Sequence, residues 1–384
     1  MKIDRVHFYT KDAPSSKDWF VGNVGFKAID NSNIIYNNYY GSHTRTEVIT
    51  LNSVCLVLQS PLTNSSPVAR YLDSHPSGVG DIVFRVKDIG AIIDRARYLG
   101  LEVLQDMETV RSKRGKFRTA KIQGWGDLHH TLIEDPKERD INPRNFNSYI
   151  TDIDHIVLNV AAGKLNLAVK LYQELFGFKI QQSFKIQTPR SGLYSQALID
   201  DSGTVQFNIN EPTSNNSQIQ QFIDLNRGSG IQHLALRSQN LIADVARMQD
   251  NLVEFLKIPR AYYSDSLNRL SNLSPQEWQA IIKQQILVDS DSANMRSLTN
   301  AVAHGGDPHR ESGICPLTQS ISSRKDRAAS LLMQIFTQPI FEQPTFFLEF
   351  IERRQQAQGF GEGNFQALFE AVEREQVKTR IKYN

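Results

Sequence analysis

The chain repeats itself, and this internal repeat limits the possible folds more than any other feature of the sequence. IDRVHFYT begins at Ile3 and returns as IDHIVLNV at Ile153, 150 residues later. GDIVFRV begins at Gly80 and returns as GIQHLALR at Gly230, at the same spacing. Each copy reads as a strand, a helix, several strands, and then a strand and a helix again. The sequence therefore predicts an α+β protein built from two copies of one module pair.

Length and composition agree with two domains in a soluble chain. The 384 residues suit two domains, and the polar segment 136–152, which carries two prolines, suits a linker between residues 1–150 and 151–384. Lys and Arg number 43 against 41 Asp and Glu, so there is no basic field to attract nucleic acid. No apolar run reaches the roughly 18 residues of a membrane span, and the N-terminus does not resemble a signal peptide. Cys55 and Cys315 cannot form a disulfide framework, so we expect a cytoplasmic protein. From the balanced charge and the lack of a long apolar run, we expect no nucleic-acid or membrane partners.

The two copies differ at positions that carry imidazole. His155 stands 150 residues after Arg5, and His233 stands 150 residues after Val83, so only the second copy has histidine at these places. Both histidines fall inside expected strands, where side chains two residues apart share a face. On this alternation, we expect His233 to share its face with Ile231. Imidazole chemistry is therefore expected in the second copy only.

A third expected strand, TFFLEFIER, places Glu349 among large apolar residues. A carboxylate is costly to bury unless it is paired or binds a metal. His155, His233 and Glu349 would match the two-histidine, one-carboxylate set that holds non-haem iron(II) and leaves positions open for substrate. Two simpler interpretations stay open. The histidines could be ordinary hydrogen-bonded residues, or Glu349 could pair with Arg353 or Arg354.

Most of residues 150–380 resembles the 4-hydroxyphenylpyruvate dioxygenase family. The signatures that carry the resemblance follow the family's order: IDHIVLNV, SGLYSQALI, NINEP, GIQHLAL, RAYYSDSLNRL, QQILVD, LLMQIFTQP, PTFFLEFIERR and GFGEGNFQALFEAVEREQ. The first half matches more loosely, as a degenerate copy without metal. The resemblance implies a vicinal-oxygen-chelate fold, in which paired βαβββ modules form half-open barrels. It also implies iron in the C-terminal barrel only, with a C-terminal lid helix.

The resemblance implies roles for individual residues. His155, His233 and Glu349 match the family's Fe(II) ligands. The positions that match its substrate pocket are Ser195, Asn210, Gln218, Gln232, Gln334, Phe336 and Phe365. Neutral amides and a hydroxyl can hold an α-keto acid and a phenol without adding a charge that competes with the metal, and phenyl rings can enclose the aromatic ring.

The activity that the resemblance implies is the conversion of 4-hydroxyphenylpyruvate and O₂ to homogentisate and CO₂. The steps would be oxidative decarboxylation, ring hydroxylation and side-chain migration. One alternative is hydroxymandelate synthase, which is similar in fold and iron site but hydroxylates the benzylic carbon. Another is a non-catalytic binding or assembly homologue, disabled by an insert at about residues 292–330. The family also implies a homodimer or homotetramer, acting in tyrosine catabolism or prenylquinone biosynthesis.

The stretch QGFGEGNFQALFE resembles a phosphate-binding loop at first sight, but its glycines lack the GxGxxG spacing and too little chain follows for a βαβ unit. Phe365 begins an apolar stripe typical of a docking helix, with Asn364 before it. We interpret the first turn as a lid whose glycines let Phe360 and Phe365 close the iron pocket. The residues assigned to this lid are Phe360, Gly361, Gly363, Asn364 and Leu368.

Two features depart from the family pattern. Residues at about 292–330 form an extra segment rich in Ser, Gly, Arg and Asp where the family has a short turn, and we expect a surface insert. His304, His309 and Cys315 within it match no zinc spacing. Asn208 stands where the family often has proline, near the expected substrate wall.

Overall fold

The computed structural model of the protein describes most of the two repeated copies. The described residues are 1–29, 43–112, 115–135, 148–187, 192–260, 262–263, 273–290, 330–361 and 363–364. The expected insert, apart from Ser330, lies outside them, as do Phe365 and Leu368 of the expected lid. None of the helices in the described ranges is long and apolar enough to cross a membrane.

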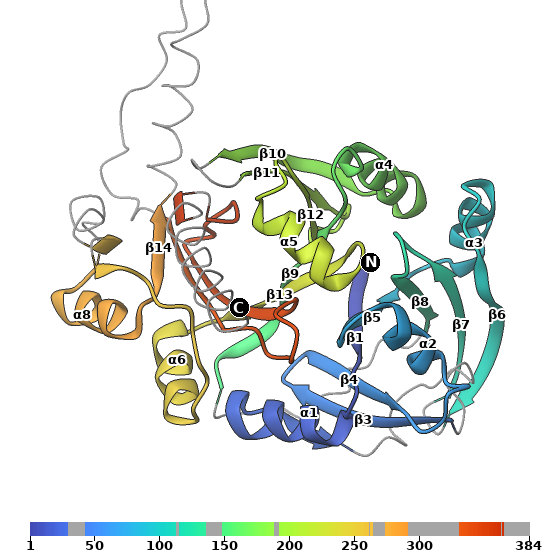
Figure 1. Cartoon of the computed structure of the whole chain (residues 1–384), viewed down its shortest axis with the longest axis horizontal. Helices are drawn as coiled ribbons and strands as arrows, with labels where there is room; N and C mark the ends of the chain where they lie inside the picture. Colours follow the sequence, from blue (N-terminus) through green and yellow to red (C-terminus); the bar gives the residue numbers. More distant parts are fainter. Residues whose placement is uncertain are drawn as a thin grey trace, which may run out of the picture.

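The first half of the chain forms one sheet with its helices (Figure 1). Its strands are β1 (Lys2–Tyr9), β2 (Lys27–Ile29), β3 (Thr44–Leu51), β4 (Val54–Pro61), β5 (Gly78–Arg85), β6 (Val103–Ser112), β7 (Gly115–Gln123) and β8 (His129–Glu134). Its helices are α1 (Ala13–Trp19), the π-helix η1 (Phe20–Val24), α2 (Pro67–Ser74) and α3 (Ile89–Tyr98).

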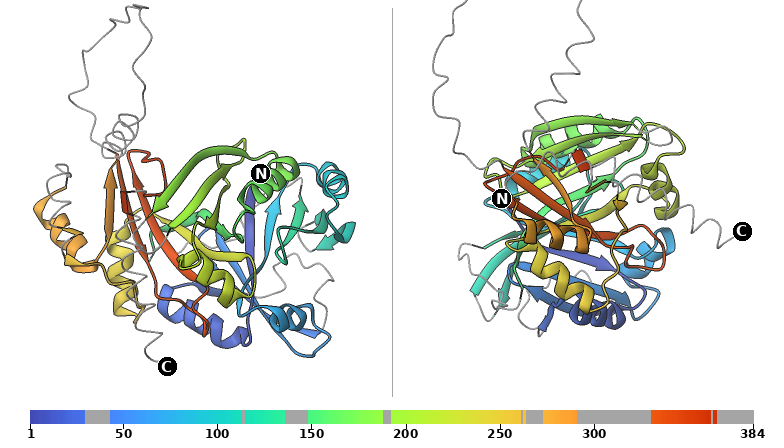
Figure 2. Two further views of the ribbon diagram at one scale, coloured as in Figure 1. Left: turned by 45° about the horizontal axis from the view of Figure 1, so that its top comes forward. Right: turned by 90° about the vertical axis from the view of Figure 1, so that its left-hand side faces the viewer.

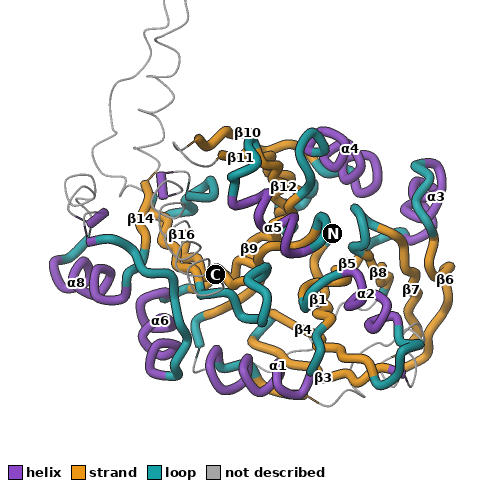
Figure 3. Tube along the Cα trace, in the orientation of Figure 1, coloured by secondary structure: helices purple, strands orange, loops and turns teal. Residues whose placement is uncertain are grey.

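The second half repeats this plan. Its strands are β9 (Ile150–Asn159), β10 (Lys179–Gln187), β11 (Gly192–Ile199), β12 (Gln206–Pro212), β13 (Gly230–Ser238), β14 (Leu287–Ser290), β15 (Leu331–Phe336) and β16 (Phe347–Arg354). Its helices are α4 (Leu165–Phe176), α5 (Gln218–Asn226), α6 (Leu241–Asp250) and α8 (Pro275–Gln284). Figure 3 shows α6 and α8 side by side near β14.

The strand order confirms the repeat. The first sheet runs β2-β3-β4-β1-β5-β8-β7-β6, and the second runs β10-β11-β12-β9-β13-β16-β15-β14, which is the same order copy for copy. Both sheets are mixed, because β1–β4 and β5–β8 pair in parallel, as do β9–β12 and β13–β16. Each sheet curves into a half-open barrel, and the two barrels lie against each other (Figure 2). The predicted α+β architecture is therefore confirmed.

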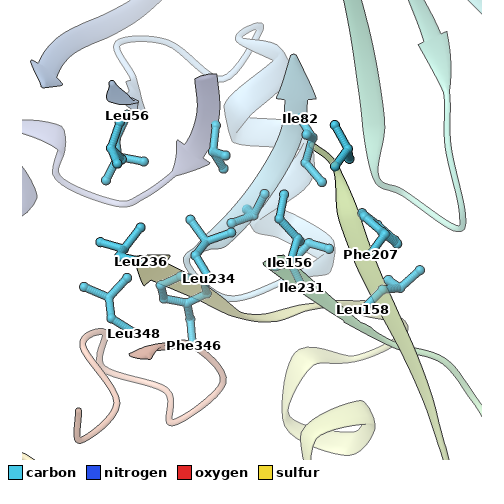
Figure 4. Packing of buried hydrophobic residues seen from close by; sticks show 14 of the residues in the cluster. Leu56, Ile82, Ile156, Leu158, Phe207, Ile231, Leu234, Leu236, Phe346 and Leu348 are labelled. Atoms are coloured by element: carbon cyan, nitrogen blue, oxygen red, sulfur yellow. The ribbon is translucent and has the colours of Figure 1, made fainter. Parts of the chain in front are cut away.

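One hydrophobic core joins the two halves. Figure 4 shows Leu56 and Ile82 of the first sheet facing Ile156 and Leu234 of the second. Each of these four side chains is fully buried, and burying a large aliphatic side chain contributes about 1.5–3 kcal/mol. Because alternate residues of a strand point to opposite faces, the faces of β9 and β13 that do not enter this core line the inside of the second barrel.

Local sequence signals account for several helix ends. The Ser274 hydroxyl accepts a hydrogen bond from the Glu277 amide at 3.2 Å, which caps α8. Gly177, with a φ of 75°, ends α4 in the left-handed conformation that glycine favours. On α4, Leu165 is buried, whereas Leu167 is 53% exposed. The helix packs beside α3, where Arg95 Nε donates to the carbonyl of Leu175.

Candidate metal centre

Three neighbouring strands of the second barrel bring His155, His233 and Glu349 together. β13 lies between β9 and β16, and Ala235 on β13 pairs with His155 on one side and with Glu349 on the other. Glu349 Oε2 is 3.3 Å from His155 Nε2 and 3.4 Å from His233 Nε2. One ligand atom from each residue lies within 4.8 Å of the others, and all three side chains are buried. The predicted ligand set therefore forms one compact group.

Two β-bulges set the direction of these side chains. Neither bulge was predicted from the alternation of the sequence. The pairing of β13 with β9 shifts between Ile231 and His233, so Gln232 is an extra residue at that point. Ile231 enters the hydrophobic core, while His233 points into the barrel. The prediction that Ile231 and His233 share a face is therefore wrong. A second shift, opposite Ala235, makes Asp154 the extra residue beside His155.

The electrostatics of the group favour binding a cation. Burial would lower the pKa of His155, but the charge of Glu349 and a hydrogen bond to Asp154 outweigh it and raise this pKa to about 9. Burial lowers the pKa of His233 in spite of Glu349. Burial would raise the pKa of Glu349, but the charge of His155 lowers it to about 2. The buried carboxylate is thus balanced by a proton on His155, and a divalent metal would replace that proton.

The arginine alternative for Glu349 is wrong. Arg353 binds the carboxylate of Asp154, and Arg354 binds Glu352 at 2.6 Å and Glu277 at 2.5 Å. Glu349 instead accepts a hydrogen bond from Gln334 Nε2 at 2.8 Å. No guanidinium balances its charge in the part of the chain that the structure describes, which leaves the two imidazoles for that role.

A row of neutral polar side chains lies across the neighbouring strands β9, β12 and β11. Asn159, Asn210 and Ser195 are aligned on β9, β12 and β11. Asn210 Nδ2 donates to Asn159 Oδ1 at 3.3 Å. The Ser195 hydroxyl is buried and has no hydrogen-bond partner among the described residues. An unpaired buried polar atom is costly, so this hydroxyl is suited to bind a ligand.

Asn208 extends the same row, two residues from Asn210 on β12. Phe207 and Ile209 enter the core, so Asn208 between them faces the barrel, aligned with Val157. Its Oδ1 is buried without a partner among the described residues. Gln218, the first residue of α5, is also buried. Four predicted pocket residues are thus buried in the second half: Ser195, Asn210, Gln218 and Gln334. One of them, Gln334, contacts the group directly through Glu349. Gln232, at the bulge, is half-buried.

Phenyl rings form the wall around the imidazoles. Phe347 stacks on His233 with ring centroids 4.7 Å apart, and Phe336 meets both rings edge-on. Phe360, a predicted lid residue, meets His155 edge-on at 5.1 Å and is buried. The position of Phe347 was not predicted as a site residue, although its alternation with Glu349 on one strand could have indicated it.

The start of the predicted lid is held against the metal ligands. Gln334 Nε2 donates to the carbonyl of Phe360 at 2.9 Å, and its Oε1 accepts from Asn364 Nδ2 at 3.0 Å. The Gly363 amide donates to Asp289 Oδ2 at 2.9 Å. Gly363 and Asn364 are both helical, whereas we expected Asn364 to precede the helix. Gln334 therefore joins the carboxylate ligand to this segment.

In the first barrel, the position that corresponds to the metal centre holds the ammonium group of Lys121. The register pairs His7 with Asp81, as it pairs Val157 with His233, so the structural counterpart of His233 is Asp81 rather than the predicted Val83. Lys121 Nζ lies 2.9 Å from Asp81 Oδ2, and both side chains are fully buried. Burial would raise the pKa of Asp81, but Lys121 holds it well below its usual range. An ammonium group thus occupies the position that corresponds to the metal centre.

Comparison with known proteins agrees with this geometry. Residues 2–140 and 152–270 match the model of the Glyoxalase/Bleomycin resistance protein/Dioxygenase superfamily. A 4-hydroxyphenylpyruvate dioxygenase of Caenorhabditis briggsae is 30% identical, over 98% of this chain and 92% of that protein. An uncharacterized protein of Synechocystis is 33% identical over 97% of each chain. A solved mutant of 4-hydroxymandelate synthase from Streptomyces coelicolor covers 98% of each chain with a TM-score of 0.78 and 25% identity.

The paired barrels and their buried group of two histidines and one carboxylate define the class as a vicinal-oxygen-chelate enzyme. The chain belongs to the Glyoxalase/Bleomycin resistance protein/Dioxygenase superfamily and, within it, to the 4-hydroxyphenylpyruvate dioxygenase family.

Proposed function

We propose that the protein is an Fe(II)-dependent dioxygenase that converts 4-hydroxyphenylpyruvate and O₂ to homogentisate and CO₂. The observation that supports this most is the convergence of His155, His233 and Glu349 within 4.8 Å inside one barrel. Two imidazoles and one carboxylate suit ferrous iron and leave coordination positions open for other ligands. The family relatives support the same substrate.

His155 Nε2, His233 Nε2 and Glu349 Oε2 would hold the iron. When bound, the metal would supply a site for chelation of the α-keto acid and for activation of O₂. The protein's own part is to orient the imidazoles. Asp154 accepts a hydrogen bond from His155 Nδ1 at 2.9 Å, so Nδ1 keeps its proton, and Nε2, which faces Glu349, is the atom that would give up its proton to bind the metal.

The remaining barrel residues would bind and orient the organic substrate. Ser195, Asn210 and Gln218 offer neutral hydrogen-bonding groups, which can hold a phenol or a carboxylate without competing for the metal. Phe336, Phe347 and Phe360 surround the imidazoles with apolar surface. This surface excludes water, so polar contacts inside the pocket are stronger than in solution.

Hydroxymandelate synthase is the second candidate, because a mutant of such an enzyme is a structural neighbour over the full length. Both reactions would use the same ligand set and differ in the carbon that is hydroxylated. The cytoplasmic location, the homodimer or homotetramer, and the pathway in tyrosine catabolism or prenylquinone biosynthesis stay predictions. So do the domain boundary at residue 150 and the surface insert.

The deciding experiment is anaerobic reconstitution with Fe(II), followed by turnover of 4-hydroxyphenylpyruvate in air and identification of the product by mass and chromatography. Homogentisate supports the proposal, and hydroxymandelate would replace it with the second candidate. We expect His155→Ala and Glu349→Gln to lose metal and turnover while staying folded. Glu352→Gln is the matched control, because Glu352 is also buried on β16 but binds Arg354 and the Leu241 amide. It should keep the metal.

A further inference from the structure

Asp154, the bulged residue beside His155, is a buried carboxylate bound from three sides. Its Oδ1 accepts from His155 Nδ1 at 2.9 Å and from Arg353 Nη2 at 2.8 Å. Its Oδ2 accepts from Arg353 Nε at 2.8 Å and from Arg237 Nε at 2.9 Å. Asp154 is 1% exposed. Such a two-pronged contact between a guanidinium and a carboxylate fixes the orientation of both groups.

Arg353 also reaches away from Asp154, toward the chain that follows β16. Its Nη1 donates to the carbonyls of Ala357 at 3.2 Å and Gly359 at 2.7 Å. Its guanidinium lies 5.9 Å from the ring centre of Phe360, and that ring meets the His155 imidazole edge-on. The contacts close a ring of interactions: His155, Asp154, Arg353, the segment 357–361, and His155 again.

Arg237 provides a contrast within the same cluster. It binds the same carboxylate oxygen, Oδ2 of Asp154, but its other acidic neighbour is Asp152 on β9, at 3.8 Å. Its side chain is 39% exposed, against 11% for Arg353. Both arginines therefore balance the negative charge of Asp154, whereas Arg353 makes the contacts to the segment 357–361.

We propose that Arg353 is a positioning residue that couples metal binding at His155 to the placement of the segment 357–361, acting through Asp154. The inference rests on the proposed metal centre. A metal fixes the His155 ring, which fixes Asp154 and the planar guanidinium of Arg353, and the guanidinium then holds the two carbonyls. Because coupling between two sites is reciprocal, a well-placed segment also strengthens metal binding by the same factor.

The test measures this coupling without using turnover. Co(II), which is stable in air, is added to the purified full chain, and hydrogen–deuterium exchange is followed in peptides covering residues 355–361. In the unchanged protein, Co(II) should slow exchange there by about tenfold, within the usual range of such coupling. Arg237→Gln, the matched control, should keep this slowing. Arg353→Gln should reduce it to below about threefold, the remainder being carried by Gln334, which joins Glu349 to the Phe360 carbonyl.

Metal affinity gives the reciprocal measurement. In Arg353→Gln, the Co(II) dissociation constant should be higher than in the unchanged protein, as measured from the visible absorption of the bound ion. The factor of this rise should equal the factor by which the substitution reduces the slowing of exchange. Arg353→Lys should behave like Arg353→Gln, because an ammonium cannot bridge carboxylate and carbonyls as a planar fork does. It also serves if the glutamine variant does not fold.

The outcomes separate this inference from the proposed function. If Co(II) does not bind to the unchanged protein at His155, His233 and Glu349, the proposed function fails. If Co(II) binds but does not slow exchange in residues 355–361, or if the arginine variants lose the slowing equally, only the coupling role of Arg353 is refuted. A larger loss in the Arg353 variants, with unfolding midpoints similar to that of Arg237→Gln, supports it.

Discussion

Replacing Gly361 with alanine should disable the metal centre without touching a metal ligand. Gly361 has a φ of +76°, in the left-handed region, and a Cβ built there would lie 1.8 Å from Gln334 Oε1. The Gln334 side chain would have to leave its place. Its contacts to Glu349, to the Phe360 carbonyl and to Asn364 would be lost together.

The size of the effect follows from two separate costs. Left-handed backbone costs alanine about 1–2 kcal/mol relative to glycine. The hydrogen bond from Gln334 to the charged Glu349 contributes about 1.5–3 kcal/mol, and each of the two neutral ones about 0.5–1.5 kcal/mol. Loss of the Gln334 contacts alone should therefore exceed about 2.5 kcal/mol, which corresponds to nearly a hundredfold.

Gly177→Ala is the matched control for backbone strain. Gly177 has almost the same φ, +75°, and a Cβ there would meet no atom within 4 Å. It ends α4, away from the metal centre. We expect Gly177→Ala to lower the free energy of unfolding by about 1–2 kcal/mol with kcat/KM unchanged, and Gly361→Ala to lower kcat/KM by about two orders of magnitude. If the two variants differed by less than threefold in kcat/KM and in Co(II) affinity, Gln334 would not position the centre in the way argued above.

Three further predictions concern the rest of the molecule. Asp81→Asn should cost about 3–5 kcal/mol in urea unfolding because the buried Lys121 loses the carboxylate that balances its charge, whereas Asp81→Asn with Lys121→Met should recover much of this. Burial lowers the pKa of His7 to about 3 and the pKa values of His129 and His130 to about 4; the unfolded chain therefore binds more protons below pH 6.5, and stability should fall from pH 6.5 toward pH 4, with each of these histidines contributing up to about 1.4 kcal/mol per pH unit, a contribution that His130→Gln should remove. Phe347→Ala removes the ring stacked on His233 and should weaken Co(II) binding about tenfold, as seen by titration, with no change if the ring has no orienting role.

Much of the metal centre could be predicted because its residues depart from the repeat and from the apolar pattern of their strands. His155 and His233 stand in only one of two repeated copies, and Glu349 stands among apolar residues that would normally exclude a charge. The resemblance to a known family then assigned roles. What it could not give was the way these side chains are held, because Asp154 and Arg353 are 199 positions apart and meet only when β9 and β16 flank β13.

The bulges are the clearest failure of pattern reasoning. Strict alternation predicted a shared face for Ile231 and His233, and the constant repeat offset of 150 residues predicted an equivalence of His233 with Val83. A signal was present, since Ile153 and Ile156 both pack in the core, as do Ile231 and Leu234. A spacing of three cannot fall on one face of a regular strand, so it indicates an extra residue between. Asp154 and Gln232 are those residues.

By itself, the sequence determined the double α+β plan, the succession of strands and helices along each copy of the repeat, and the three residues able to bind a metal, because these depend on local pattern and residue type. The tertiary structure decided which faces those residues share, that Asp81 and Lys121 fill the corresponding place in the first barrel, and that Arg353 and Gln334 join the ligands to the segment 357–361. Strand register causes the difference. A shift of one residue reverses every side chain beyond it, and register is set by packing across the sheet rather than along the chain.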